Sequence, residues 1–245
     1  MAFRTYGSTI SLGFGGPTTR AVKQLLIANT AAFVASVLLQ AAGFGTPVHA
    51  LMLTPYAVTH SFALWQPVTY LFLHGGFFHI LFNMLSLWMF GCDLERTWGT
   101  RRFLTYYFLT GVGAGLCVVL VNPNSLVATL GASGAIYGIL LAYGLLFPDR
   151  MILFFMLFPI PAKYFVMILG GIAFLSAMSM PGDMISHVAH LGGLVIGFIY
   201  LRGRGRYFDW RNHYYRWRRQ RLQRKFQVYQ SKKDRDDGRP NRWVN

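Results

Sequence analysis

The sequence predicts an all-α fold, namely a polytopic membrane helix bundle with six transmembrane helices and both termini on the cytoplasmic side. Three observations predict it. Of the 245 residues, 54% are hydrophobic and 13% are charged, which is about half the charged fraction of a typical soluble domain. The hydrophobic residues come in blocks of roughly the 20 residues that a helix needs to cross a bilayer core. Lysine and arginine collect in alternate connections between these blocks, as the positive-inside rule requires.

Six blocks are expected to span the membrane, and they divide the chain into three parts. The expected spans are 24–44, 76–92, 103–121, 131–147, 164–179 and 184–201. They leave a cytoplasmic N-terminal segment at 1–23 and a basic cytoplasmic tail at 202–245, on either side of a membrane domain at 24–201. Helices are the expected element because a helix satisfies its own backbone hydrogen bonds in lipid.

The positions of the basic residues predict the orientation. Fifteen of the 23 lie in the tail, and the others are Arg4, Arg20, Lys23, Arg96, Arg101, Arg102, Arg150 and Lys163. The connections 45–75, 122–130 and 180–183 hold none. Because cytoplasmic loops carry the excess of Lys and Arg, both termini are expected in the cytoplasm, which requires an even number of spans.

Two connections are unusually apolar. Residues 45–75 are uncharged and include Trp65, Tyr56 and Tyr70, a composition that suits a segment lying in the outer membrane interface. Residues 151–162 are interrupted by two prolines and are expected to lie in the cytoplasmic interface. A fifth span that begins within them is the alternative.

Polar side chains within the expected spans gather at one depth. Polar groups are costly in hydrocarbon, so each is a candidate for function. His79 and Asn83 lie in the first two turns of the second span, Ser133 in the first turn of the fourth, and His190 in the second turn of the sixth. These three spans run from outside to inside, so at 1.5 Å per residue the side chains lie roughly 5–12 Å below the outer surface. The common depth indicates a site.

Helical spacing places further residues on shared faces. Ser133 and Tyr137 are four residues apart, as are His79 and Asn83, so each pair shares a face. Small residues at the same spacing let membrane helices approach closely. Two such pairs stand in the fourth and sixth spans: Gly134 with Gly138, and Gly193 with Gly197. Close approach is what a hydrogen bond of about 2.6–3.2 Å between Ser133 and His190 requires.

Four motifs resemble those of the rhomboid family, in the family's order and over about residues 24–201. The nucleophile motif GxSG, followed by a tyrosine one turn later, is matched by Gly131, Ser133, Gly134 and Tyr137. The motif AHxxGxxxG is matched by Ala189, His190, Gly193 and Gly197. The motif HxxxxHxxxN is matched by His74, His79 and Asn83, and GxxxExxxG by Gly91, Glu95 and Gly99. The first long loop departs from the family, which often has Trp-Arg where this chain has Trp65-Gln66.

The resemblance implies an intramembrane serine endopeptidase that hydrolyses a peptide bond in or near the transmembrane helix of a membrane-protein substrate. It implies Ser133 as the nucleophile and His190 as the general base, with Tyr137 packed on the His190 ring. It also implies that His79, Asn83 and the Ser133 backbone N–H hold the oxyanion. Gly131 is a supporting residue of the same motif, and no metal or other cofactor is implied.

Two other functions stay open. A metal-binding or haem-binding membrane protein would use His79, His187 and His190, and Asp183 precedes His187 and His190 at a spacing that suits metal ligands. A non-proteolytic rhomboid-like protein would bind membrane proteins without cleaving them. Such relatives normally lack the serine or the histidine, and this chain has both.

The tail at 202–245 combines its fifteen basic residues with four acidic residues and interleaved tryptophan and tyrosine. This composition is typical of a segment that contacts anionic lipids. Nucleic-acid binding has the same charge signature but is not expected. The expected partners are therefore transmembrane protein substrates and the lipid bilayer. The expected location is a multi-pass position in a bacterial cytoplasmic membrane.

Overall fold

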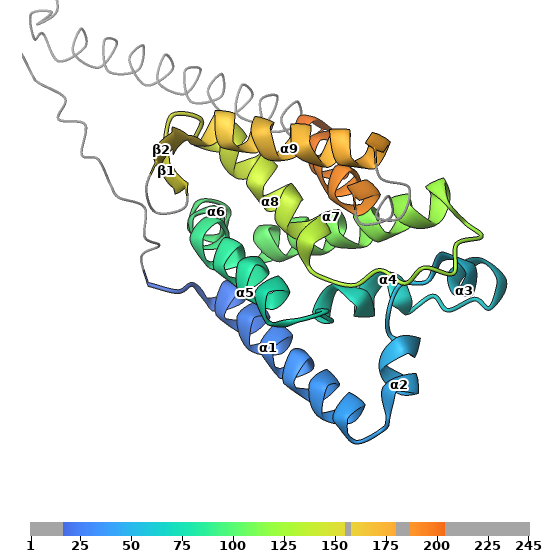
Figure 1. Ribbon diagram of the computed structural model, residues 1–245. Coiled ribbons are helices and arrows are strands. Elements are labelled where there is room, and N and C mark those ends of the chain that lie inside the picture. The colour runs from blue at the N-terminus through green and yellow to red at the C-terminus, as the bar shows by residue number, and fades with distance from the viewer. Residues whose placement is uncertain (1–16, 155–157, 180–186, 204–245) are drawn as a thin grey trace, which may run out of the picture. The chain divides into compact units, whose positions relative to one another are not determined.

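The computed structural model describes residues 17–154, 158–179 and 187–203, and these residues are mostly helical (Figure 1). The first long helix is α1 (Arg20–Ala41), and four short elements follow it: α2 (Gly45–Ala50), α3 (Pro55–His60), α4 (Gln66–Thr69) and the 3-10 turn η1 (Tyr70–Phe72). One continuous helix then consists of α5 (Phe77–Ser86), the π-helical turn η2 (Leu87–Gly91) and α6 (Cys92–Trp98). The remaining helices are α7 (Thr100–Val121), α8 (Ser133–Leu146), α9 (Ala162–Ser179) and an unlabelled one over 187–203.

Three helices of the described chain are long and apolar enough to cross a membrane: α1, the continuous helix Phe77–Trp98, and α7. Two shorter apolar helices cover Ser133–Leu146 and Ala162–Leu175. These helices confirm the prediction of a mostly helical membrane protein. The count of six spans and the sides on which the termini lie stay predictions.

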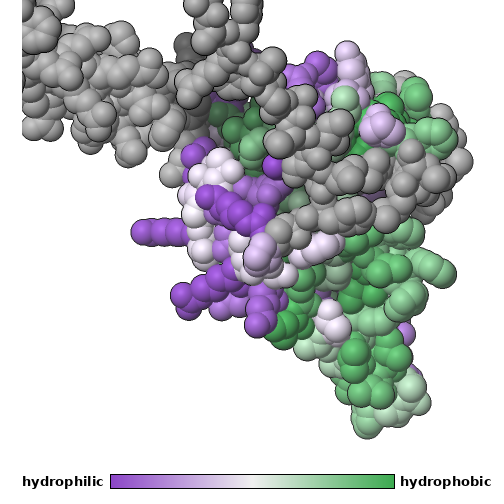
Figure 2. Space-filling model, turned by 90° about the vertical axis from the view of Figure 1, so that its left-hand side faces the viewer, coloured by the Kyte–Doolittle hydropathy of each residue, from purple (hydrophilic) through white to green (hydrophobic). Residues whose placement is uncertain are grey.

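The surface of these helices is apolar where a water-soluble protein would be polar. On α1 alone, the exposed large side chains include Ile27, Val34, Val37, Leu38 and Leu39. Figure 2 shows a broad hydrophobic area on one face of the molecule, with hydrophilic side chains gathered beside it. Apolar patches this large mark a surface that meets lipid or another protein.

Residues 151–154 and 158–161 form strands, which corrects the all-α prediction in this segment. Strand β1 (Met151–Phe154) pairs antiparallel with β2 (Phe158–Pro161), and Met151 lies opposite Pro161. Proline has no N–H to donate, and a strand at the edge of a sheet tolerates it. Helix α9 begins at Ala162, the last residue of this segment, so the two strands are not part of the fifth predicted helix.

Helix α8 lies within the bundle and is largely buried (Figure 1). It packs against α7 through small residues on both helices. A Cβ atom at Gly134 would lie 2.6 Å from Cβ of Ala114, and one at Gly138 would lie 2.7 Å from Cβ of Thr110. The two helices therefore approach more closely than larger side chains would allow.

The segment 45–75 packs partly into the bundle and partly at the surface. Tyr70 is 1% exposed and donates a hydrogen bond of 2.6 Å to the carbonyl oxygen of Gly111 in α7. Trp65 and Tyr56 are exposed, as expected for an interfacial segment. Tyr70 differs from that expectation because its ring fills the space beside Gly115, where a Cβ atom would lie 2.9 Å from the ring.

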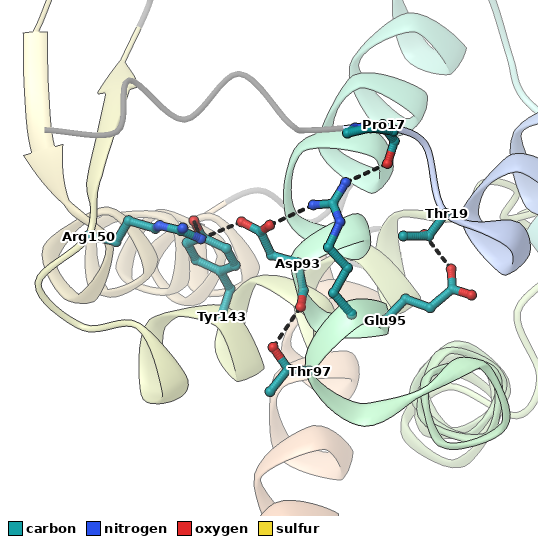
Figure 3. A network of polar contacts seen from close by, with 8 residues as sticks. Pro17, Thr19, Asp93, Glu95, Thr97, Tyr143 and Arg150 are labelled. Carbon is teal, nitrogen blue, oxygen red and sulfur yellow. Dashed lines mark hydrogen bonds and ion pairs between the residues drawn. The ribbon is translucent and has the colours of Figure 1, made fainter. Parts of the chain in front are cut away.

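A polar network joins the end of α6 to the start of α1 (Figure 3). The Glu95 carboxylate accepts hydrogen bonds of 3.0 Å from the backbone N–H groups of Ala21 and Val22. It also accepts hydrogen bonds from the hydroxyls of Thr19 and Thr100. These N–H groups belong to the first turn of α1 and have no partner within that helix, so Glu95 caps α1 from a distant part of the chain.

The start of α6 is tied to the strand pair. The Asp93 carboxylate forms an ion pair of 2.9 Å with Arg96 and a second ion pair with Arg150, directly before β1 (Figure 3). Arg96 also donates a hydrogen bond to the carbonyl oxygen of Pro17. Arg96 and Arg150 both lie in connections that are predicted to be cytoplasmic. Together they join α6 to the residues before α1 and to the residues before β1.

The contacts between Cα atoms divide the chain into a unit Met1–Tyr200 and a unit Leu201–Asn245. The first unit contains every element named above except residues 201–203 of the unlabelled helix. Residues 204–245, which hold most of the predicted basic tail, lie outside the described residues.

Candidate active site

Ser133 and His190 are in hydrogen-bonding contact. Ser133 is the first residue of α8, and its Oγ lies 2.9 Å from Nε2 of His190, which belongs to the helix over 187–203. The Tyr137 ring stacks on the His190 ring, with centroids 4.3 Å apart and an angle of 11° between the planes. The structure thus brings together three of the predicted site residues. The Ser133 hydroxyl contacts one ring nitrogen of His190, and the Tyr137 ring packs against the face of the same imidazole.

This contact depends on two helices that touch through their backbones. A Cβ atom at Gly193 would lie 2.0 Å from the carbonyl oxygen of Gly134, so no side chain fits there. One turn further, a Cβ atom at Gly197 would lie 2.5 Å from the Tyr106 hydroxyl and 3.5 Å from Cα of Gly138. The predicted small residues therefore lie where α8, which begins at Ser133, meets the helix that contains His190.

His79 lies against the backbone that leads into Ser133. Gly131 has a φ of +125°, and a Cβ atom there would lie 2.7 Å from Nε2 of His79. A residue with a side chain would be strained at this φ and would also collide with the imidazole. Gly131 therefore sets both the path of the chain and the close approach of His79.

Asn83 lies one turn after His79 on the same face of α5. Its side chain is buried, and its Nδ2 donates a hydrogen bond of 2.8 Å to the carbonyl oxygen of His79. An amide group has two N–H bonds, so one remains for another acceptor. The structure thus places the two predicted oxyanion residues on one helix face, with His79 beside Gly131.

Known proteins resemble this chain over more than half of its length. A family model for the rhomboid domain matches residues 61–206, more than half of the chain. This chain belongs to the rhomboid family. It is 32% identical over 171 residues to rhomboid protease GlpG of Haemophilus influenzae, an alignment that covers 70% of this chain and 85% of that protein.

Two eukaryotic proteins are similar over a smaller part of their length. Rhomboid protein 1, mitochondrial, of Saccharomyces cerevisiae is 34% identical over 139 residues, which cover 53% of this chain and 38% of that protein. RHOMBOID-like protein 1 of Arabidopsis thaliana is 34% identical over 164 residues, which cover 64% and 40%. This rhomboid thus spans less than half the length of both. Family membership and the apolar helices together identify an integral membrane protein.

His74, to which sequence analysis assigned no role, supports the site of this rhomboid. Its ring is 6% exposed and meets the His79 ring edge to face, with centroids 5.1 Å apart. Burial, and secondly the neighbouring His79, lower the pKa of His74 to about 4. A neutral His74 is therefore expected at physiological pH, packed against the ring that faces Gly131.

Gln66 has a structural role that no sequence signal indicated. It stands where the family often has arginine, and it is 4% exposed. Its Oε1 accepts a hydrogen bond of 2.9 Å from the Thr54 backbone N–H, and its Nε2 donates one of 3.2 Å to the Ala50 carbonyl oxygen. Gln66 thus holds the end of α2 and the start of α3 together by hydrogen bonds that need no charge.

The metal-site alternative falls partly outside the described residues, because Asp183 lies in the segment 180–186. His187 and His190 are described, with ring centroids 6.2 Å apart. Within the described ranges, no three His, Cys, Asp or Glu side chains are grouped so that they could hold a metal ion. Of the two ring nitrogens through which His190 could bind a metal, Nε2 contacts Ser133 Oγ.

Proposed function

We propose that this protein is an intramembrane serine endopeptidase that hydrolyses a peptide bond in or near the transmembrane helix of a membrane-protein substrate. The observation that carries the proposal is the 2.9 Å contact between Ser133 Oγ and His190 Nε2, with the Tyr137 ring stacked on the His190 ring. The similarity to rhomboid protease GlpG supports it, because the alignment covers 85% of that protein.

In the proposed reaction, Ser133 Oγ attacks the carbonyl carbon of the scissile bond while His190 Nε2 takes the hydroxyl proton. His190 then gives this proton to the leaving amine, and an acyl group remains on Ser133. Water, again deprotonated by His190, releases that acyl group and restores the serine. Tyr137 holds the orientation of the His190 ring throughout, and the pair works without a third, acidic residue.

The developing oxyanion is held by His79, Asn83 and the backbone N–H of Ser133. Their support is the position of His79 beside Gly131 and the second N–H of the Asn83 amide, besides the one bonded to the His79 carbonyl oxygen. Preorganised donors of this kind stabilise charge that appears only in the transition state, and removing one commonly costs about 3 kcal/mol.

The proposal includes the topology predicted from the sequence. Six spans cross a bacterial cytoplasmic membrane, both termini lie in the cytoplasm, and the site opens toward the outer side, where water reaches it. The membrane domain covers 24–201, and the basic tail at 202–245 contacts anionic lipids. Substrates enter from the bilayer, so the partners are transmembrane proteins and lipid.

The test uses purified protein in lipid bilayers with a model transmembrane substrate. Ser133→Ala and His190→Ala are expected to abolish cleavage while the protein stays folded, because little core volume changes. Thr105→Ala is the matched control, because it removes an exposed hydroxyl of α7 that bonds the Arg101 carbonyl oxygen of its own helix, and it is expected to cleave normally. A fluorophosphonate probe should label the wild type and not Ser133→Ala. Cleavage that persists in Ser133→Ala would refute the proposal.

A further inference from the structure

The backbone before α5 contacts the imidazole of His79. The N–H of Gly75 donates a hydrogen bond of 3.3 Å to Nδ1 of His79. In a neutral imidazole one ring nitrogen carries the proton and the other accepts hydrogen bonds. Because the Gly75 N–H points at Nδ1, Nδ1 is the acceptor. The proton of the ring is therefore on Nε2.

The Nε2 edge of His79 faces the segment that leads into the nucleophile. A Cβ atom at Gly131 would lie 2.7 Å from this Nε2 and 3.9 Å from the backbone nitrogen of Ser133. An oxyanion bound near the Ser133 N–H needs further N–H donors around it. With the proton on Nε2, His79 presents a donor at this edge. With the proton on Nδ1, it would present a lone pair and repel the oxyanion.

We propose that Gly75 is a positioning residue whose backbone N–H selects the Nε2-protonated form of His79. The inference rests on the proposed function, in which His79 stabilises the oxyanion. His74 restrains the same ring from its edge, with centroids 5.1 Å apart. Together these contacts fix which nitrogen carries the proton and where it points. The donor is thus in place before a substrate binds.

The backbone of Gly75 matters here, and its lack of a side chain does not. A Cβ atom at this position would meet only Cδ1 of Leu130 at 3.6 Å and Nδ1 of His79 at 3.9 Å, which are ordinary contacts. Gly75→Ala is therefore expected to keep the N–H, the hydrogen bond and the protonated Nε2. A tautomer that changes in Gly75→Ala would mean that the glycine acts through its small size, and would overturn the proposal.

The first experiment reads the tautomer directly. The full-length protein is labelled with ¹⁵N-histidine, reconstituted in bilayers at pH 8, and studied by solid-state NMR. Comparison with His79→Gln assigns the His79 signals. The expected spectrum has a protonated Nε2 and a bare Nδ1, and a protonated Nδ1 would overturn the proposal. This measurement needs no change at Gly75, so it decides the tautomer even if a variant there fails to fold.

The second experiment removes the N–H alone. Glycolic acid in place of Gly75, introduced by nonsense suppression, replaces the amide with an ester and keeps the size of the residue. The kcat for the transmembrane substrate is expected to fall about 5-fold or more with little change in KM, and His79 is expected to populate both tautomers. The matched control is the same exchange at Gly76, which keeps the hydrogen bond between Gly75 and His79.

The two proposals fail in different ways. An ester at residue 75 that leaves kcat and the tautomer as in the wild type overturns the role of Gly75. In that case Ser133→Ala still abolishes cleavage, and the proposed function stands. Cleavage that survives in Ser133→Ala refutes the proposed function instead, whatever the tautomer of His79.

Discussion

At the scale of single residues, Gly131 shows how one position serves both the chain and the site. Its φ of +125° is a conformation that residues with a side chain rarely adopt, and its Cα faces the His79 ring. Strain and collision both follow from adding one methyl group. The position therefore couples the path of the backbone before Ser133 to the placement of His79.

Gly131→Ala is expected to lower kcat strongly because the added Cβ pushes His79 away from the oxyanion. Part of the loss comes from collision with His79 and part from backbone strain, and a double-mutant cycle with His79→Ala separates them. In the His79→Ala background the collision is gone, so the further loss from Gly131→Ala should shrink. Fully additive losses would contradict the contact between Gly131 and His79.

His79→Ala and Asn83→Ala are expected to act on the transition state. Each should lower kcat by about 10- to 1000-fold and change KM much less, because the oxyanion forms only during reaction. Steady-state kinetics on the transmembrane substrate measures both parameters. An effect on KM alone would instead assign these residues to substrate positioning, and loss of folding would make them structural.

At the scale of elements, the site depends on the contact between α8 and the helix over 187–203. These helices meet at Gly134 and Gly193 without an intervening side chain, and a hydrogen bond of 2.8 Å from the Tyr106 hydroxyl to the Gly138 carbonyl oxygen adds α7 to the contact. In lipid, such close packing supplies the attraction between helices that the hydrophobic effect supplies in water. The spacing of these helices sets the distance between Ser133 and His190.

Gly193→Ala is expected to destabilise the protein by about 1–3 kcal/mol, as overpacking does, and to lower cleavage. The added Cβ would lie 2.0 Å from the Gly134 carbonyl oxygen, so the helices must separate. Gly171→Ala in α9 is the matched control, because a Cβ atom there meets nothing within 4 Å. Its stability should be unchanged or higher by up to about 1 kcal/mol. Thermal unfolding in detergent measures both, and equal values for the two variants would contradict the close contact.

At the scale of the whole molecule, the distribution of charge predicts a topology that can be mapped in cells. The connection 122–130 holds no Lys or Arg, while 93–102 holds three arginines. In the predicted topology these connections lie on opposite sides of the membrane. Exposed positions are available in both, at Asn124 and Thr97.

Asn124→Cys is expected to react with a membrane-impermeant maleimide in intact cells, and Thr97→Cys only after the cells are lysed. The chain has two cysteines, the buried Cys92 and the half-buried Cys117, so the labelling of the unsubstituted protein is measured as the background for both variants. Labelling of Thr97→Cys in intact cells would reverse the predicted orientation. Equal labelling of both variants would contradict an odd number of crossings between them.

Chelators are expected to leave cleavage unchanged, because the proposed chemistry uses Ser133 and His190 without a metal. His187→Ala and Asp183→Asn should also retain cleavage. The assay is a chelator titration of the wild type beside the two variants. Loss of activity in all three would favour the metal-site alternative.

The sequence by itself determined the membrane class, the mostly helical fold, the family and the residues proposed for the site. These follow from signals that are local along the chain: the length of apolar blocks, the placement of charge and short motifs. The bounds of some elements did not follow. Helix α1 begins at Arg20, four residues before the predicted span, and the cap that holds this start is Glu95, 74 residues away from Ala21.

The tertiary structure alone decided which atoms meet. Ser133 and His190 are 57 residues apart, and their contact requires the backbones of two helices to touch at Gly134 and Gly193. Residue patterns do not indicate the hydrogen bond from Gly75 to His79, since any residue except proline has an N–H to donate. They do not indicate the strand pair before α9 either. A pattern indicates which side chains share a face, but a distance of 2.9 Å is set by how closely whole helices pack.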